Sequence, residues 1–242
     1  MLYSGLLIAI LGTAILSGIL GMAGGMILMA ILASTVSVAS AMMLHGAVQL
    51  TSNGSRAWFL REHIQWQIFP AYAVGTAAAL GLFTWLVFVP DPGLVLILVG
   101  ALPILARFTP RLKGLDITRP ATTVTCGFVV TSAQLLAGAS GPLLDLFYLR
   151  SPLERHAVVA NKAITQAFGH AIKLFYYGII VSAVEDIPAW FYAVAMLTAV
   201  AGARIGTRLL DHLNEDSFRR WSSWAILTIA VLCVARGVEQ LL

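Results

Sequence analysis

Apolar runs of about the length that crosses a lipid bilayer recur along the whole chain. The 242 residues are 59% hydrophobic and only 11% charged, whereas soluble domains carry roughly 25% charged residues. A soluble core cannot bury so many long apolar runs, so lipid must cover most of the surface. We therefore predict an all-α polytopic integral membrane protein, inserted as a multi-pass protein in the cell (inner or plasma) membrane.

The pattern indicates about eight hydrophobic segments, four on each side of a basic connector at residues 107–119. The first half (1–112) has runs at 2–34, 39–60, 66–89 and 93–106, and the second half (113–242) has runs at 120–149, 156–183, 188–210 and 217–238. Small residues interrupt the first run of each half, at residues 21–25 and 138–142. We predict two homologous repeats in one transmembrane domain, each beginning with a broken helix.

The charges of the loops predict how the repeats are oriented. If every segment crosses the membrane, the basic loop residues divide six against five between the two sides. If each broken segment instead folds back as a hairpin, ten share one side and only Arg236 faces the other. The second arrangement fits the positive-inside rule far better, and it makes the two repeats inverted copies, as in many transporters.

Two polar stripes lie inside apolar segments and match each other after a shift of 117 positions. The first comprises His45, Gln49, Asn53 and Arg56, and the second comprises Lys162, Gln166, His170 and Lys173. Their spacing places each set on one helical face, where an ionisable group costs about 2.5–3.5 kcal/mol on insertion scales. Both stripes are rich in donors and contain no carboxylate, so we expect them to bind an oxygen-rich anion.

Other readings of the stripes stay open. A single polar residue in a span often makes only a helix–helix hydrogen bond. Arg56 and Lys173 lie near the expected helix ends, where their charges would snorkel to the membrane surface.

The small-residue interruptions fit the same anion site. We expect the backbone to unwind there and to offer free N–H groups and helix N-termini, which attract anions. The residues involved are Gly21, Gly24, Gly25, Gly138, Ser140 and Gly141. The alternative is that these small residues only allow helices to pack closely.

The second copy carries more titratable groups than the first, so we expect it to supply substrate charge and proton coupling. His170 and Asp145 are the candidates for proton coupling, because histidine titrates near physiological pH. Asp145, whose counterpart is Leu28, could instead form a structural ion pair with Lys162 or Lys173.

Several function classes have no support in the sequence. It contains no P-loop, no H-E-x-x-H and no G-x-S-x-G motif, so we expect neither an ATP-driven motor nor an enzyme, and no cofactor or metal. The modest net charge of +4 is typical of basic membrane loops and gives no reason to expect a nucleic-acid partner.

Several motifs resemble the TauE/SafE sulfite exporter family. They are Leu-Ser-Gly-Ile-Leu-Gly-Met-Ala-Gly-Gly at 16–25, Gly-Ala-Ser-Gly-Pro-Leu at 138–143, and the Lys, Gln and His-x-x-Lys positions within 161–173. The resemblance implies transport of sulfur-containing anions such as sulfite or organosulfonates, driven by an ion gradient. The chain departs from the family pattern at Met22 and Ala23, where glycine is usual, and it lacks a proline near Ala30.

We therefore predict a secondary transporter of a small sulfur-containing anion, coupled to protons or another ion. His45, Gln49, Asn53, Lys162, Gln166 and His170 would contact the anion, with the backbone of the two interruptions. A passive anion channel and a transporter of another small oxyanion or a carboxylate are the alternatives. A homo-oligomer is left open.

Overall fold

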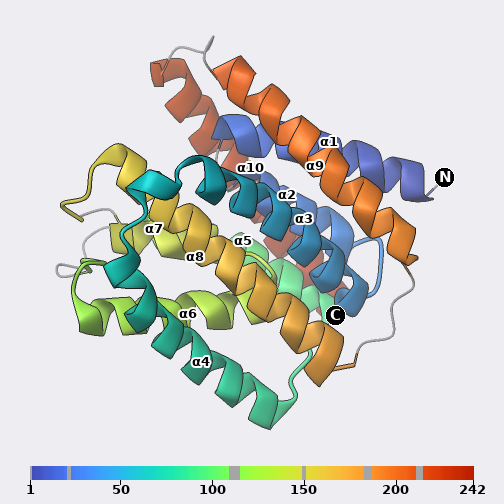
Figure 1. Ribbon diagram of the computed structural model, residues 1–242. Helices are drawn as coiled ribbons and strands as arrows, with labels where there is room; N and C mark the ends of the chain where they lie inside the picture. The colour runs from blue at the N-terminus through green and yellow to red at the C-terminus, as the bar shows by residue number, and fades with distance from the viewer. Residues whose placement is uncertain (1, 21–22, 109–114, 149–150, 183–186, 211–214) are drawn as a thin grey trace.

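The computed structural model describes residues 2–20, 23–108, 115–148, 151–182, 187–210 and 215–242, and these are helical with short connections (Figure 1). The helices are α1 (Leu2–Leu20), α2 (Ala23–Ala33), α3 (Val38–Phe59), η1 (Arg61–His63), η2 (Trp66–Ile68), α4 (Phe69–Leu86), α5 (Pro92–Phe108), α6 (Pro120–Ala137), α7 (Gly141–Tyr148), α8 (Arg155–Phe175), the π-helix η3 (Tyr176–Ile180), α9 (Ala189–Leu210) and α10 (Glu215–Leu241). No strand occurs in these ranges. The predicted all-α class is confirmed.

Four stretches of the described chain are long and apolar enough to cross a membrane, and they belong to α1, η2 with α4, α6 and α9. The helices α3 and α8 are 22 and 21 residues long, but their polar stripes lower their hydropathy. Large apolar side chains such as Ile8, Trp85 and Leu197 point outward and are 73%, 80% and 72% exposed. Such an apolar exterior suits lipid rather than water.

The first broken segment forms a helical hairpin. α2 packs against α1, and Gly24 lies so close to α1 that an added Cβ would meet Thr13 and Ser17. The free ends of the hairpin line one open depression, which contains Leu2 and Tyr3 from α1, the last residue of α2 (Ala33) and residues 34–37 that follow it. The start of α5, at Asp91 and Pro92, lines the same depression. The chain therefore returns to the face from which α1 begins.

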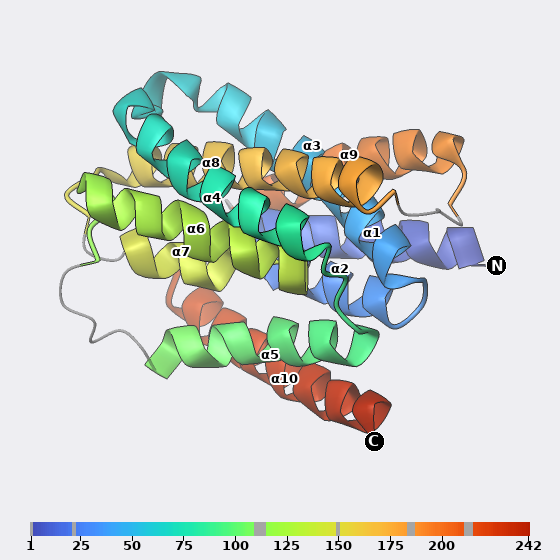
Figure 2. The same ribbon diagram turned by 90° about the horizontal axis from the view of Figure 1, so that it is seen from below.

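The second broken segment also folds back. Gly138 ends α6 in the left-handed region, with φ of 72°, and its N–H donates to the carbonyl of Gln134 at 3.0 Å. Glycine adopts this conformation at little cost, so it allows the sharp reversal into α7. The N–H of Ile117, before α6, donates to the carbonyl of Phe147, near the end of α7, at 3.2 Å. Both ends of this hairpin therefore lie together (Figure 2).

Helices from the two halves of the chain pack in pairs. α1 packs on α9, α5 on α10, α4 on α6 and α3 on α8 (Figures 1 and 2). At the α4–α6 contact, a Cβ at Gly75 would meet the carbonyl of Val124, and one at Gly127 would meet that of Tyr72. Since α3 carries the first polar stripe and α8 the second, their pairing places the two stripes next to each other.

Candidate functional site

A small cavity lies where α3 and α8 meet the two helix interruptions. Its volume is about 20 Å³, which is enough for roughly one water molecule. Its walls come from both halves of the chain: Ser17, Gly25, Met26, His45, Gln49, Ser52, Asn53, Arg56, Ala139, Ser140, Gly141, Gln166 and His170. The fold therefore gathers most members of the two stripes and parts of both interruptions around one space.

A continuous hydrogen-bond chain connects the two interruptions behind this cavity. The Nε2 of His45 lies 2.8 Å from the carbonyl oxygen of Gly25. A carbonyl can only accept, so Nε2 carries a hydrogen and donates it. The Nδ1 of His45 lies 2.9 Å from the Nζ of Lys173, which also donates to the carbonyl of Gly138 at 3.0 Å. Lys173 of the second half is thus joined through His45 to the first half.

Lys173 is completely buried, with an exposed fraction of 0%. The expectation that its charge snorkels to the membrane surface is wrong. The helix does not end near Lys173, because α8 continues directly into the π-helix from Tyr176 to Ile180. Lys173 therefore lies within a continuous helical segment. Arg56 is in the last turn of α3, but it is only partly exposed and lines the cavity.

The other stripe residues present donors and acceptors to the same space. The ring of His170 lies 5.4 Å from that of His45, and the buried Nδ1 of His170 has no hydrogen-bond partner among the described residues. The Nδ2 of Asn53 donates to the carbonyl of Gln49 at 3.0 Å. Gln49 and Gln166, which match each other in the two stripes, both line the cavity.

The N-terminal ends of two short helices also reach the cavity. α2 begins at Ala23 and lines it through Gly25 and Met26, while α7 begins at Gly141. The first N–H groups of a helix have no partner within it, and the helix dipole places positive potential there. Both helix ends therefore favour a negatively charged group in the cavity.

The glycines do not all act as expected. Gly24 and Gly25 lie inside α2 rather than in unwound backbone, because α2 already begins at Ala23. Gly24 packs on α1, and Gly25 faces Gln49. Gly138 offers its carbonyl to Lys173 instead of an N–H to the cavity. Gly21 is outside the described residues.

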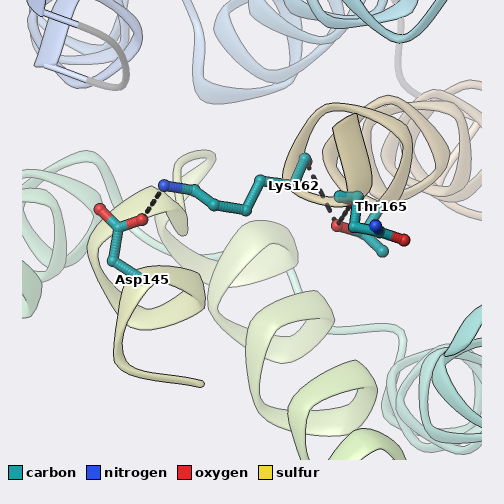
Figure 3. A network of polar contacts seen from close by, with 4 residues as sticks. Asp145, Lys162 and Thr165 are labelled. Carbon is teal, nitrogen blue, oxygen red and sulfur yellow. Dashed lines mark hydrogen bonds and ion pairs between the residues drawn. The ribbon is translucent and has the colours of Figure 1, made fainter. Parts of the chain in front are cut away.

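Lys162 and Asp145 form an ion pair with each other, between α8 and α7 (Figure 3). Neither residue lines the cavity, and their side chains are 23% and 42% exposed. The prediction that Lys162 contacts the substrate is not supported by this geometry, because its charge is directed at a carboxylate on α7. The position that matches Asp145 after the shift of 117 is Leu28, so the first half of the chain has no equivalent pair there.

Sequence reasoning missed some residues at the site. Ser17 and Ser52 line the cavity. Gln134 is 1% exposed, and its Oε1 accepts a hydrogen bond from the hydroxyl of Ser140 at 3.3 Å. Ser17 and Gln134 are related by the same shift of 117 that relates the stripes. Extending the repeat comparison to the helices before the interruptions would have found them.

The charged side chains in and next to the cavity are positive. Arg56 lines it, Lys173 lies behind His45, and none of the described lining residues is a carboxylate. The larger depression at the free ends of α1 and α2 is different, because Asp91 is the charged residue among its described lining. An acidic group repels anions, so the smaller, buried cavity is the better anion site.

Comparison of the chain with known protein families shows which family it matches. The family model described as sulfite exporter TauE/SafE matches residues 6–233. The chain belongs to the TauE/SafE sulfite exporter family. The match includes both helix interruptions and both polar stripes, and it confirms the family resemblance of the motifs. No curated protein and no solved structure matches the chain significantly. Members of the TauE/SafE family are membrane transporters, so membership agrees with transport rather than catalysis.

Proposed function

We propose that this TauE/SafE protein is a secondary active transporter of small sulfur-containing anions, such as sulfite or an organosulfonate, in the cell membrane. The observation that carries the proposal is the cavity between α3 and α8. Donor groups from both halves of the chain converge there without an opposing carboxylate among the described lining residues. His45, Gln49, Asn53, Gln166 and His170 would hold the anion, assisted by Arg56 and the N-termini of α2 and α7.

We further propose that the two repeats are inverted and change the access of the cavity by moving against each other. The two hairpins support this arrangement, since each brings its own ends together. The hairpin of the first half opens at the face that contains Asp91. Arg119 lies at the start of α6, and Arg155 at the start of α8, so the positive-inside rule would put these residues on the cytoplasmic side.

Labelling of single cysteines tests this orientation. The buried Cys126 and Cys233 are first replaced by serine. Two single-cysteine variants, Ser37→Cys and Glu154→Cys, are then made in this background, because both positions are exposed. A membrane-impermeant maleimide applied to intact cells should label only one of them. Labelling of both positions from the same side would rule out inverted repeats.

The size of the cavity favours a carrier over a channel. A space of about 20 Å³ holds about one water molecule, which is less than a four-atom oxyanion needs. Side chains must therefore withdraw before the anion enters. A channel requires a continuous polar pore, whereas this cavity is small and most of its lining side chains, among them His45, Asn53 and His170, are buried.

Transport assays with purified protein in liposomes test the function. We expect saturable uptake of radiolabelled sulfite, accelerated by unlabelled sulfite inside the liposomes. A hydrogen bond to a charged group contributes about 1.5–3 kcal/mol, so Gln49→Leu and Gln166→Leu should each weaken affinity about 10- to 100-fold. The exposed Gln67→Leu is the matched control.

The alternatives give different results in this assay. Flux that rises linearly with sulfite and shows no acceleration by internal sulfite would indicate a channel. Unchanged affinity in both glutamine variants would refute the site. Competition by methanesulfonate and by acetate separates a sulfonate transporter from a carboxylate transporter.

A further inference from the structure

Among the described residues, no carboxylate lies beside the charge of Lys173. The titratable groups that face Lys173 are His45 of α3 and His170 of its own helix, while the interruption after α6 contributes only the carbonyl of Gly138. Of the helices that contact α8, α7 carries Asp145, which is paired with Lys162, and η1 carries Glu62, which is exposed. Lys173 does not itself line the cavity, but its hydrogen-bond partner His45 does. Within the part of the chain that the structure describes, an anion in the cavity is therefore the negative charge that would balance an ammonium ion at this position.

Burial of a charge that has no opposite charge nearby has a high free-energy cost. Transfer of an isolated ammonium ion to an apolar interior costs so much that the group usually becomes neutral instead. With an anion in the cavity, attraction between the two opposite charges offsets this cost. When the anion leaves, the same environment favours the neutral amine.

The hydrogen bonds of Lys173 are compatible with both the protonated ammonium and the neutral amine. An ammonium group has three hydrogens, and two of them are used, toward the Nδ1 of His45 and the carbonyl of Gly138. A neutral amine still has two hydrogens, so both bonds can persist after one proton is lost. The third hydrogen is the one that can leave without disturbing the link between the two halves.

We propose that Lys173, held by His45, carries the coupling proton of transport. This inference rests on the proposed function. When the anion enters the cavity, the Nζ lone pair takes a proton from water on the side from which the anion came. After the anion leaves, that Nζ–H bond breaks and the proton returns to water on the side to which the cavity then opens. The loaded carrier moves with an ammonium ion and the anion, and the empty carrier returns with a neutral amine. One proton thus accompanies each anion, and no redox change is involved.

This assignment differs from the candidates that the sequence suggested. Asp145 is paired with Lys162, so its charge is already balanced whether or not the anion is present. His170 lines the cavity, and in this mechanism its role is contact with the anion.

Lys173→Arg tests the mechanism, because arginine keeps the positive charge but does not release its proton in proteins. Two sulfite fluxes are compared in proteoliposomes: exchange of internal for external sulfite, and net uptake. Exchange needs only the loaded carrier, whereas net uptake also needs the empty carrier to return. We expect Lys173→Arg to retain exchange and to lose net uptake by at least about tenfold relative to exchange.

Lys162→Arg is the matched control, since it makes the same change on the same helix at a partly exposed, ion-paired lysine. It should leave the ratio of net uptake to exchange unchanged. A wild-type ratio in Lys173→Arg, or the loss of net uptake in Lys162→Arg instead, would overturn the inference. Absence of saturable exchange in the wild-type protein would instead refute the proposed function.

A second measurement uses only the wild-type protein, in case Lys173→Arg does not fold. The ratio of net uptake to exchange is measured between about pH 5 and about pH 9. Protonation of sulfite itself affects both fluxes and cancels in this ratio. The ratio should rise with pH, because the empty carrier returns only with a neutral amine. A ratio that does not depend on pH would overturn the assignment.

Discussion

Two neighbouring glycines at the start of α2, Gly24 and Gly25, should respond differently to replacement by alanine: the first variant should lose stability, and the second should lose sulfite affinity. In Gly24→Ala, the added methyl group would meet the carbonyl oxygen of Thr13 and the hydroxyl and the N–H nitrogen of Ser17, all on α1. Two of these three atoms are backbone, and backbone within a helix cannot move alone. The methyl group must therefore push α1 and α2 apart.

The expected loss of stability follows from these contacts. Overpacking costs about 2 kcal/mol at the middle of its usual range, and replacement of glycine by alanine in a helix regains up to about 1 kcal/mol. Gly24→Ala should therefore lower the free energy of unfolding by about 1–2 kcal/mol. For a chain of this size, this corresponds to a fall in Tm of about 2–8 °C.

In Gly25→Ala, the methyl group would meet only the end of the Gln49 side chain, and its next neighbour, the Nε2 of His45, lies at 3.8 Å, an ordinary contact distance. The amide of Gln49 can rotate away, so the Tm should change little. Since Gln49 lines the cavity, loss of its hydrogen bond to the anion should weaken sulfite binding about 10- to 100-fold.

Thermal unfolding and sulfite binding of the purified proteins in detergent test both expectations. The double variant Gly25→Ala with Gln49→Ala is the control: once Gln49 is truncated, the methyl group has room, so the double variant should bind sulfite as Gln49→Ala does. The reasoning fails if Gly25→Ala unfolds as early as Gly24→Ala, or if the two binding losses add.

Three further predictions concern the packing around the site. His45→Leu should lower the free energy of unfolding by about 2–5 kcal/mol, because it removes the hydrogen bonds of His45 to the Nζ of Lys173 and to the carbonyl of Gly25 and leaves the buried Nζ with one fewer acceptor; added Lys173→Met should restore part of this loss in thermal unfolding, and fully additive losses would contradict the link. Asp145→Asn should cost less than about 1 kcal/mol, because its ion pair is partly exposed; a larger cost that persists in concentrated salt would count against this reading. Gly127→Val should lower the Tm through overpacking at the α4–α6 contact without changing sulfite affinity, and a binding defect at normal Tm would show that this contact also shapes the cavity.

Regular spacing made much of the site predictable from sequence. Residues such as Gln49 and Gln166 are separated from their stripe neighbours by one helical turn, and the stripes match each other after a constant shift. A helix converts this spacing into one face, so it was possible to predict which side chains would converge. The two interruptions were also expected near the stripes, and Gly25 and Ser140 do line the cavity.

Features that depend on a single residue or on helix length were not predictable. The burial of Lys173 depends on the continuation of α8 into a π-helix, and apolar periodicity does not reveal where such a helix ends. The orientation of Lys162 depends on Asp145, and the matching position in the first half of the chain is Leu28. Gly24 and Gly25 differ because α2 begins just before them, and helix boundaries are the least certain part of any sequence-based assignment.

The π-helix that follows α8 also determines how this helix can move. It allows two consecutive tyrosines to be buried: the hydroxyl of Tyr176 donates to the carbonyl of Phe88 at 2.8 Å, and that of Tyr177 to the carbonyl of Leu135 at 2.7 Å. This end of α8 is thus fastened to the chain just after α4 and to α6, and it can serve as a pivot. A helix of 21 residues is about 30 Å long, so a tilt of about 10° at the pivot would displace its far end by about 5 Å. Because α8 would rotate about the end that carries the tyrosines, displacement would increase with distance from them. Gln166, halfway along α8, would move about half as far as Arg155.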